Sequence, residues 1–275
     1  MLAAQPVVAP WTARLGLEFS CVGKKTILSE KRFEGPLVVQ KPLYPEGEKV
    51  CHAIVVHPPA GIAGGDELFL QVRSKPGTCV LMTTPGAGKW YRSAGPQAKQ
   101  SLSFDVAGVL EWLPRETIVF DGAIAALECD VRLRRDARYI GWEVLCLGRT
   151  GSGERFGKGE IRIDSRISRD GKPLWLERGR IPAGGALMRS AAGLAGRAVF
   201  GTLVAASTSI QKESLLMCRE KSAHGVAITL LPGLLIARYL GDSSEEAMQR
   251  FSRLWEVLRP SIAGREAVHP RIWST

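Results

Sequence analysis

Residues 160–181 read EIRIDSRISRDGKPLWLERGRI, and this stretch decides the fold class. Apolar residues alternate with polar ones on both sides of a central Asp-Gly pair: Ile161, Ile163 and Ile167 before it, Leu174 and Leu176 after it. A period of two is typical of a half-buried strand, and Asp-Gly favours the positive φ angles of a tight hairpin turn. The stretch therefore predicts two antiparallel strands that meet at Asp170-Gly171.

The same alternation recurs from about residue 50 to residue 240 and predicts further strands. The expected strands span residues 53–56, 67–72, 117–120, 129–133 and 139–147, with a second hairpin of residues 226–231 and 234–240 around Pro232-Gly233. These patterns predict a mainly β protein.

Two segments have helical periodicity. Residues 245–258 place apolar side chains on one face, Ser243 and Glu246 fit a capping box, and Pro260 is expected to end the helix. Residues 186–195 predict a shorter, weaker helix. The fold class is thus mainly β, with one or two α-helices near the C-terminal side.

The composition fits one globular domain. The chain has 275 residues, 45% of them hydrophobic, which is enough for a large core. Because no shift in composition marks a linker, we expect a single domain over residues 1–275. The 30 glycines and 16 prolines follow no repeat, which excludes collagen and solenoid architectures.

The net charge of +10 favours acidic partners and leaves a basic nucleic-acid-binding protein as one alternative. The signature of such a protein is weak here, because the longest basic cluster is 132–135 and no aromatic residues are interleaved with Lys and Arg. We therefore expect no nucleic-acid partner.

The start of the chain predicts a cytoplasmic protein. Residues 1–10 lack a positively charged beginning and contain Pro6 and Pro10, unlike a signal peptide. No segment approaches the roughly 20 apolar residues of a membrane span, so no membrane contact is expected. The six cysteines lie far apart without CxxC pairs, which is typical of reduced thiols.

Catalytic motifs fit poorly. The segment 84–89 (TPGAGK) resembles a phosphate loop, but that loop requires four residues between its first glycine and Gly-Lys, and Ser or Thr rather than Trp90 after the lysine. Neither GxSxG nor HExxH occurs. A β-sandwich hydrolase stays open as a second alternative, because the chain has four histidines: His52, His57, His224 and His269. These absences weaken the enzyme interpretation, and on residues alone both interpretations remain open.

The segment 57–66 (HPPAGIAGGD) is the most unusual in the chain. Its prolines and glycines predict a tight loop between two strands. Two interpretations remain open. The loop either holds His57 and Asp66 by structural hydrogen bonds or directs both side chains at a functional site.

Six segments in order together resemble one family, the urease accessory proteins UreD (also called UreH). They are 57–66 (HPPAGIAGGD), 83–93 (TTPGAGKWYRS), 110–122 (LEWLPRETIVFDG), 142–155 (WEVLCLGRTGSGER), 201–203 (GTL) and 270–273 (PRIW). The resemblance covers about residues 15–273.

This resemblance implies a helically wound β-sandwich. It also implies a scaffold with no enzymatic activity, no catalytic residue and no tightly bound cofactor. The scaffold is expected to bind the urease apoprotein and UreF, with the GTPase UreG recruited through UreF, in a dimer of heteromers. Nickel in transit would cross the protein through an internal, water-filled passage.

An ion that crosses a protein interior needs polar donors that hold it loosely enough to release it. The expected route residues combine acids and hydroxyls from apolar strands or motif segments with one histidine: Asp66, Glu143, Glu177, Glu111, Asp121, Thr83, Thr84 and His57. Asp66 and Glu143 are the first choice, because both lie in the motif segments. The alternative for each acid is an ion pair with an arginine such as Arg115, Arg149 or Arg155.

Aromatic residues near the C-terminus are candidates for partner binding. Phe251, Trp255 and Trp273 are of the type that anchors interfaces. The alternative is that they pack on the protein's own sheet.

Overall fold

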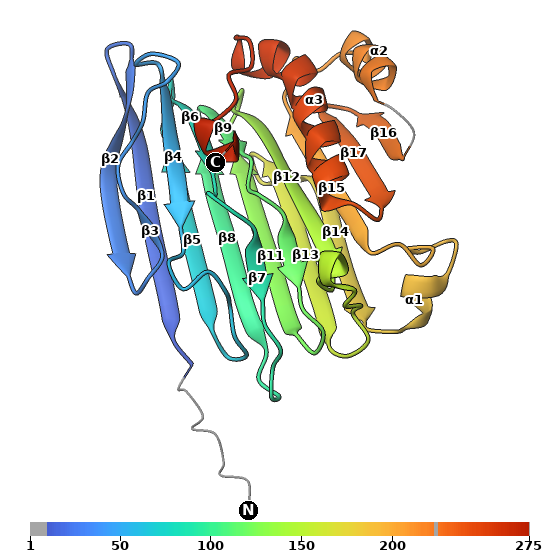
Figure 1. Ribbon diagram of the computed structural model, residues 1–275. Coiled ribbons are helices and arrows are strands. Elements are labelled where there is room, and N and C mark those ends of the chain that lie inside the picture. The colour runs from blue at the N-terminus through green and yellow to red at the C-terminus, as the bar shows by residue number, and fades with distance from the viewer. Residues whose placement is uncertain (1–9, 223–224, 275) are drawn as a thin grey trace, which may run out of the picture.

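The computed structural model describes residues 10–222 and 225–274 and contains two β-sheets that face each other (Figure 1). The seven-stranded sheet has the order β14-β13-β11-β8-β5-β1-β2. Its strands are β1 Thr12–Val22, β2 Lys25–Glu34, β5 Glu67–Ser74, β8 Ala98–Val106, β11 Ile124–Leu133, β13 Glu160–Arg169 and β14 Lys172–Pro182.

The ten-stranded sheet has the order β16-β17-β15-β12-β9-β6-β4-β3, with β7 and β10 attached beside β12. Its strands are β3 Val38–Val39, β4 Val50–Val56, β6 Cys79–Thr83, β7 Gly88–Trp90, β9 Val109–Trp112, β10 Thr117–Val119, β12 Arg138–Leu147, β15 Val199–Ala206, β16 Val226–Leu231 and β17 Leu234–Gly241.

The chain winds between the sheets as a helix. Apart from the short strands β7 and β10, which stay with the ten-stranded sheet, the chain alternates between the sheets from β4 to β13. Strands β1, β5, β8, β11 and β13 therefore run parallel in one sheet, and β4, β6, β9 and β12 run parallel in the other. Parallel neighbours need such crossover connections. The expected fold class, a mainly β, helically wound sandwich with helices towards the C-terminal side, is confirmed.

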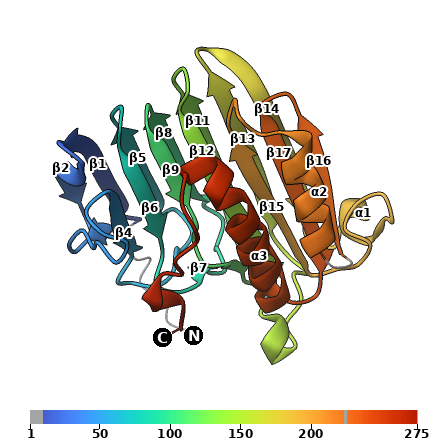
Figure 2. The same cartoon turned by 90° about the horizontal axis from the view of Figure 1, so that it is seen from above.

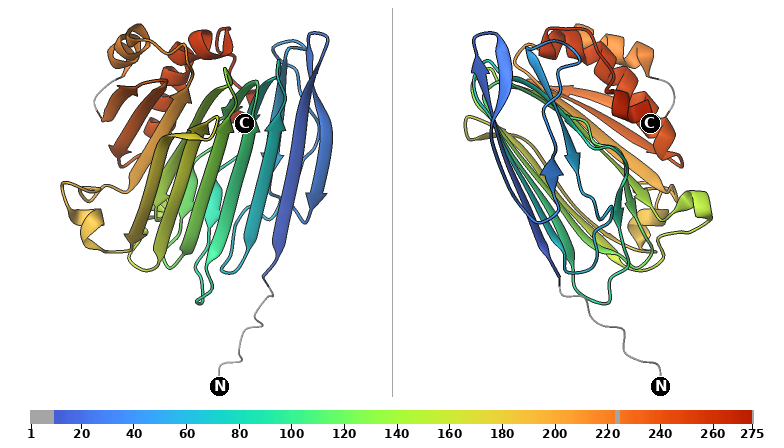
Figure 3. Two further views of the ribbon diagram at one scale, coloured as in Figure 1. Left: turned by 180° about the vertical axis from the view of Figure 1, so that it is seen from behind. Right: turned by 60° about the vertical axis from the view of Figure 1, so that its left-hand side comes forward.

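Three α-helices follow the winding part: α1 Ala186–Arg189, α2 Lys212–Lys221 and α3 Ser244–Ala263. Short 3₁₀ segments occur at Thr150–Ser152 and Arg271–Ser274. Helices α2 and α3 lie on the outer face of the ten-stranded sheet (Figure 2). Seen from behind, the seven-stranded sheet forms the opposite face of the molecule (Figure 3).

The ten-stranded sheet therefore separates two hydrophobic cores. The inter-sheet core contains side chains such as Phe104, Leu133 and Tyr139. The helix-side core contains Trp142 and Leu254, among others. Alternation along β12 sends neighbouring residues to opposite cores, as a period of two requires.

Both predicted hairpins are confirmed. Strands β13 and β14 pair around Asp170 and Gly171, whose φ angles are 48° and 77°. Strands β16 and β17 pair around Pro232-Gly233. The Asp-Gly geometry is that of a type I′ turn, which matches the twist of the flanking strands.

Helix α3 departs from the prediction at its end. The side chain of Ser243 accepts a hydrogen bond from the Glu246 N–H at 3.1 Å, as predicted, but Pro260 lies inside the helix. Pro260 removes one hydrogen bond, yet Ile262 and Ala263 bury their side chains in the helix-side core and hold the last turn in place. The helix ends at Ala263, and the residue that caps it, Gly264, is left-handed with φ 70°.

The shorter predicted helix ends early, at Arg189 rather than residue 195. The chain then folds back in turns, with the Leu194 N–H bonded to the Leu187 carbonyl. Gly193 permits this fold-back, because a Cβ atom there would lie 2.1 Å from that same carbonyl oxygen.

Candidate functional site

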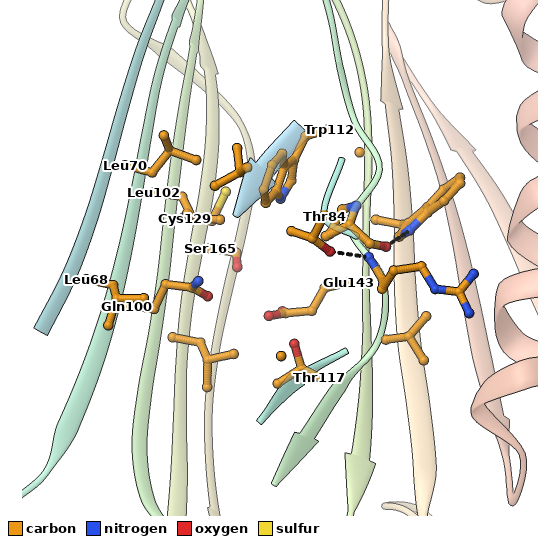
Figure 4. A pocket seen from close by; sticks show the side chains of 18 of the residues that line it. Leu68, Leu70, Thr84, Gln100, Leu102, Trp112, Thr117, Cys129, Glu143 and Ser165 are labelled. Atoms are coloured by element: carbon orange, nitrogen blue, oxygen red, sulfur yellow. Dashed lines mark hydrogen bonds between the residues drawn. The ribbon is translucent and has the colours of Figure 1, made fainter. Parts of the chain in front are cut away.

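A cavity of about 260 Å³ lies between the two sheets. Its lining extends from β5 and the segment 84–89 to the edge strand β14. Most of the wall is apolar, with Leu68, Leu70, Leu102 and Trp112 among the side chains that face the space (Figure 4). The few polar groups in this apolar wall are therefore the candidates for binding a ligand.

Strand register gathers the polar groups of the seven-stranded sheet into a row. Cys129 of β11 is paired with Ser165 of β13, and Ser165 is paired with Glu177 of β14. All three residues line the cavity. Side chains at paired positions share one face of a sheet at about 5 Å spacing. We call Cys129, Ser165 and Glu177 the first polar row.

The ten-stranded sheet carries a second row. Glu143 of β12 is paired with Thr202 of β15, which is paired with Arg238 of β17. We call Glu143, Thr202 and Arg238 the second polar row. In Figure 4 Glu143 points into the space between the sheets from one side, and Cys129 and Ser165 lie on the other. The rows thus form a polar strip across the inter-sheet core.

The Glu143 carboxylate is the most unusual group of the site. Among the described residues it has no hydrogen-bond or ion-pair partner, and its half-buried side chain lies on the cavity wall. Burial, with the nearby Glu177 charge as a second cause, raises the pKa of the Glu143 carboxyl to about 7. An unpartnered carboxylate in such a place can bind a cation that approaches through the cavity.

The two rows meet at an ion pair. The Glu177 carboxylate lies 2.6 Å from Nη1 of Arg238, which links β14 of one sheet to β17 of the other. An arginine partner for Glu177 was the alternative considered from sequence, although Arg238 was not among the arginines named there.

Two further predicted route residues line the cavity, namely Thr84 and His57. Thr84 Oγ1 accepts a hydrogen bond from the Arg115 N–H at 2.9 Å. Burial lowers the pKa of His57, the Asp66 carboxylate opposes this shift, and the His57 Nε2 atom is buried without a partner among the described residues. A neutral imidazole with a free nitrogen can bind a metal ion.

Asp66 lies outside the cavity and holds its own loop together. Its carboxylate accepts a hydrogen bond from the Ala63 N–H at 2.8 Å and one from the Trp11 N–H at 3.4 Å, and the residue is only 3% exposed. Of the two interpretations of segment 57–66, the structural one fits Asp66, whereas His57 points to the site.

The glycines of that loop serve a close contact between two of the motif segments. The Ile62 N–H donates to the Lys89 carbonyl, and the Tyr91 N–H donates to the Ile62 carbonyl, both at 2.8 Å. A Cβ atom at Gly61 would lie 1.9 Å from the Tyr91 ring. Segment 84–89, which resembles a phosphate loop, thus forms the connection from β6 to β7 and the start of β7.

Asp121, Glu111 and Thr83 also lie outside the cavity and have structural partners. Asp121 Oδ1 accepts hydrogen bonds from the N–H groups of Gly157 and Lys158 at 2.8 and 2.7 Å. The Glu111 carboxylate binds Arg259 and the Trp255 indole N–H. Thr83 donates to the Leu113 carbonyl at 2.6 Å and accepts from the Trp273 indole at 2.8 Å. A nickel role for these residues and for Asp66 has no geometric support here.

The aromatic residues proposed for partner binding pack within the chain. Phe251 and Trp255 are fully buried in the helix-side core, so neither presents surface to a partner. Trp273 is half-buried, with its ring centroid 5.8 Å from those of Trp142 and Trp255. Packing on the protein's own sheet, the alternative named above, describes all three.

Sequence reasoning missed Gln100, Cys129, Ser165, Thr202 and Arg238. Each places a polar side chain on the inward face of a strand whose other inward residues are apolar. That interruption of the alternation was the available signal, but it identifies a site only once strand register brings the interruptions side by side. Among the described residues, no three His, Cys, Asp or Glu side chains form a compact metal cluster.

Known proteins resemble this chain along almost its whole length. The family model described as UreD urease accessory protein matches residues 12–274. The urease accessory protein UreD of Azoarcus sp. (strain BH72) is 51% identical over 277 residues, covering 99% of this chain and 96% of that protein. The protein of the same name from Dechloromonas aromatica (strain RCB) is 50% identical over 283 residues, covering 99% and 98%.

Proposed function

Since the chain belongs to the UreD family of urease accessory proteins, we propose that it acts in urease maturation as a scaffold without enzymatic activity. The scaffold would bridge the urease apoprotein to UreF and, through UreF, to UreG, in a dimer of heteromers in the cytoplasm. The family supports association with urease and other accessory proteins; the particular partners follow from the resemblance. Within the described residues, no helix is both long and apolar enough to span a membrane.

We propose further that nickel, the cargo of this assembly, crosses the chain through the inter-sheet cavity. The unpartnered Glu143 carboxylate carries this proposal. A divalent ion in an apolar cavity is unstable unless polar groups or retained water replace its hydration shell. Glu143 supplies negative charge, and Thr202, Ser165 and Cys129 supply neutral donors along the same strip.

The sparse donor set suits a passage better than a storage site. Conduction requires binding that is favourable enough for entry and weak enough for release. One carboxylate with a few neutral donors falls short of the three or four strong ligands of a stable transition-metal site. The ion would therefore keep several waters and move between donors.

The alternative functions gain no specific support from the site. Three of the four histidines lie in the described residues. His52 is hydrogen-bonded to Glu46 and His269 to Glu256, each through Nε2, and His57 lines the cavity. His224 lies outside the described residues. Positive side chains on the outer face of the seven-stranded sheet are matched by acids, as in the pairs Arg134–Asp105 and Arg166–Asp164. Such pairing does not favour a nucleic-acid surface.

The test is Glu143→Gln, which removes the charge and keeps the shape. The variant is co-expressed with the urease subunits and the other accessory proteins, and nickel per urease active site is measured together with urease activity. We expect both to fall about tenfold, the effect that loss of one metal-site group commonly has.

The matched control is Asp130→Asn. Asp130 lies next to Cys129 on β11, but it is not among the residues that line the cavity, its carboxylate pairs with Arg132 and its side chain is 46% exposed, so this variant should load nickel normally. Co-purification of partners with both variants shows that assembly is intact. Full nickel loading in a stably assembled Glu143→Gln complex would refute the passage.

A further inference from the structure

The two polar rows run in one direction, from the interior to an open edge of the sandwich. Each row begins inside, at Cys129 and Glu143, and ends at the Glu177–Arg238 ion pair. The side chains of Glu177 and Arg238 are 27% and 50% exposed. Solvent therefore reaches the outer end of the strip.

Among the described residues, no backbone hydrogen bond joins the two sheets at this edge. Strand β14 is the last strand of its sheet, and β17 belongs to the other sheet. The Glu177–Arg238 contact joins the two sheets here through side chains. Its rupture would leave both strands paired with their own neighbours, β13 and β16, and so would not unfold either sheet.

The Glu177–Arg238 ion pair is weak enough to open and close repeatedly. An ion pair exposed to this degree favours its closed form over its open form by at most about fivefold. The pair therefore opens often. While the pair is closed, the Arg238 guanidinium places a positive charge at this edge and repels an approaching cation. When it opens, Arg238 can turn to solvent, and the Glu177 carboxylate becomes a ligand within the first polar row.

We propose that metal ions enter or leave the cavity between β14 and β17, through a portal that the Glu177–Arg238 ion pair closes. This inference rests on the proposed passage, because it assigns one of its ends. The other end would then lie at segment 84–89, where the cavity lining also contains Thr84 and Lys89.

Cys129 allows the portal to be tested without measuring urease. Its thiol belongs to the first polar row and lines the cavity. The full chain, in complex with its accessory partners, is treated with 2-aminoethyl methanethiosulfonate, a small cationic thiol reagent. Modification of Cys129 over time is followed by peptide mass spectrometry. We expect slow labelling in the unmodified chain.

Opening the pair should speed the reaction. Arg238→Ala and Glu177→Ala both break it, and we expect Cys129 to react up to about sixfold faster, because the pair is already open for part of the time. Arg238→Ala should be the faster of the two, because it also removes the repelling charge. A neutral reagent, methyl methanethiosulfonate, should gain less from Arg238→Ala than the cationic one. The charge-reversed pair Glu177→Arg with Arg238→Glu should restore slow labelling.

Cys218 provides the internal reference. It is buried on α2 in the helix-side core, so general loosening would accelerate its labelling too, whereas a portal would not. Unchanged Cys129 rates in both single variants would overturn the portal. The passage is judged separately. If nickel loading depends on Glu143 but the labelling rate of Cys129 does not depend on the Glu177–Arg238 pair, the proposed passage is retained and its end lies elsewhere.

Discussion

Glu143 has opposite effects on function and stability. Its folded-state pKa of about 7 lies above the ordinary value of 4.5. Between these values the folded chain binds a proton that the unfolded chain has lost, so the free energy of unfolding falls as the pH rises from about 4.5 to 7. Above pH 7 the cost of the buried charge is fully present. A charge retained at that cost is consistent with a functional carboxylate.

The residue-scale prediction follows from this linkage. Glutamine cannot ionise, so Glu143→Gln should raise the free energy of unfolding of the metal-free chain by about 1–3 kcal/mol at pH 8. At pH 4.5 the gain should nearly vanish. Urea denaturation with a chelator present, at both pH values, measures the difference. An equal gain at the two pH values would show that the charge is not its cause.

Sequence reasoning found Glu143 and Glu177 by one signal, an acid in an apolar strand. The same signal selected Glu111 and Asp121, which have structural roles. The difference depends on partners that are far away in the chain: Glu111 binds Arg259, 148 residues later, and Asp121 binds the Gly157 N–H, 36 residues later. Spacing along a sequence does not show such contacts, and the site was therefore predicted only in part.

At the scale of elements, α3 is fixed to the sheet by buried charge as well as by apolar packing. Arg259 is fully buried and binds the carboxylates of Glu46 and Glu111, each within 3.0 Å. Burial alone would raise the pKa of the Glu46 carboxyl, but the hydrogen bonds from His52 and Arg259 lower it to about 2. Removal of one partner leaves the others charged and without compensation.

Arg259→Met should therefore destabilise the protein by about 3–5 kcal/mol. Arg253→Met is the matched control, because Arg253 lies exposed on the same helix and its loss should change stability by less than about 0.5 kcal/mol. Urea denaturation at pH 7 compares the two variants. A cost below 1 kcal/mol for Arg259→Met would mean that apolar packing alone holds α3.

Local chemistry determined which elements could be predicted. The hairpins at Asp170-Gly171 and Pro232-Gly233 depend on turn residues next to each other, and both were found. Helix α2 was missed because only Cys218 is buried, while Leu216 and Met217 are about half exposed, so the segment has no apolar stripe. Strand β1 was missed although Ala13, Leu15, Leu17 and Phe19 alternate as buried residues.

At the scale of the whole molecule, the winding was available only through the family resemblance. Alternation shows that a strand is half-buried, but not which strand lies beside it. Strands β5 and β8 pair with Glu67 opposite Lys99, 32 residues along, because the intervening chain crosses to the other sheet and returns. Such register depends on packing across the whole sandwich.

The two cores should unfold together, as expected of a single domain. Strand β12 contributes Tyr139 and Leu145 to the inter-sheet core and Trp142 and Val144 to the helix-side core. Unfolding of either core would therefore disrupt a strand that the other core packs against. Leu133→Ala in the first core and Leu254→Ala in the second should each cost about 2–5 kcal/mol. In both variants, far-ultraviolet circular dichroism and tryptophan fluorescence should report one coincident transition in urea. If the two probes instead reported separate transitions in either variant, the chain would contain two units that unfold independently, and one core would be enough to keep the ten-stranded sheet folded.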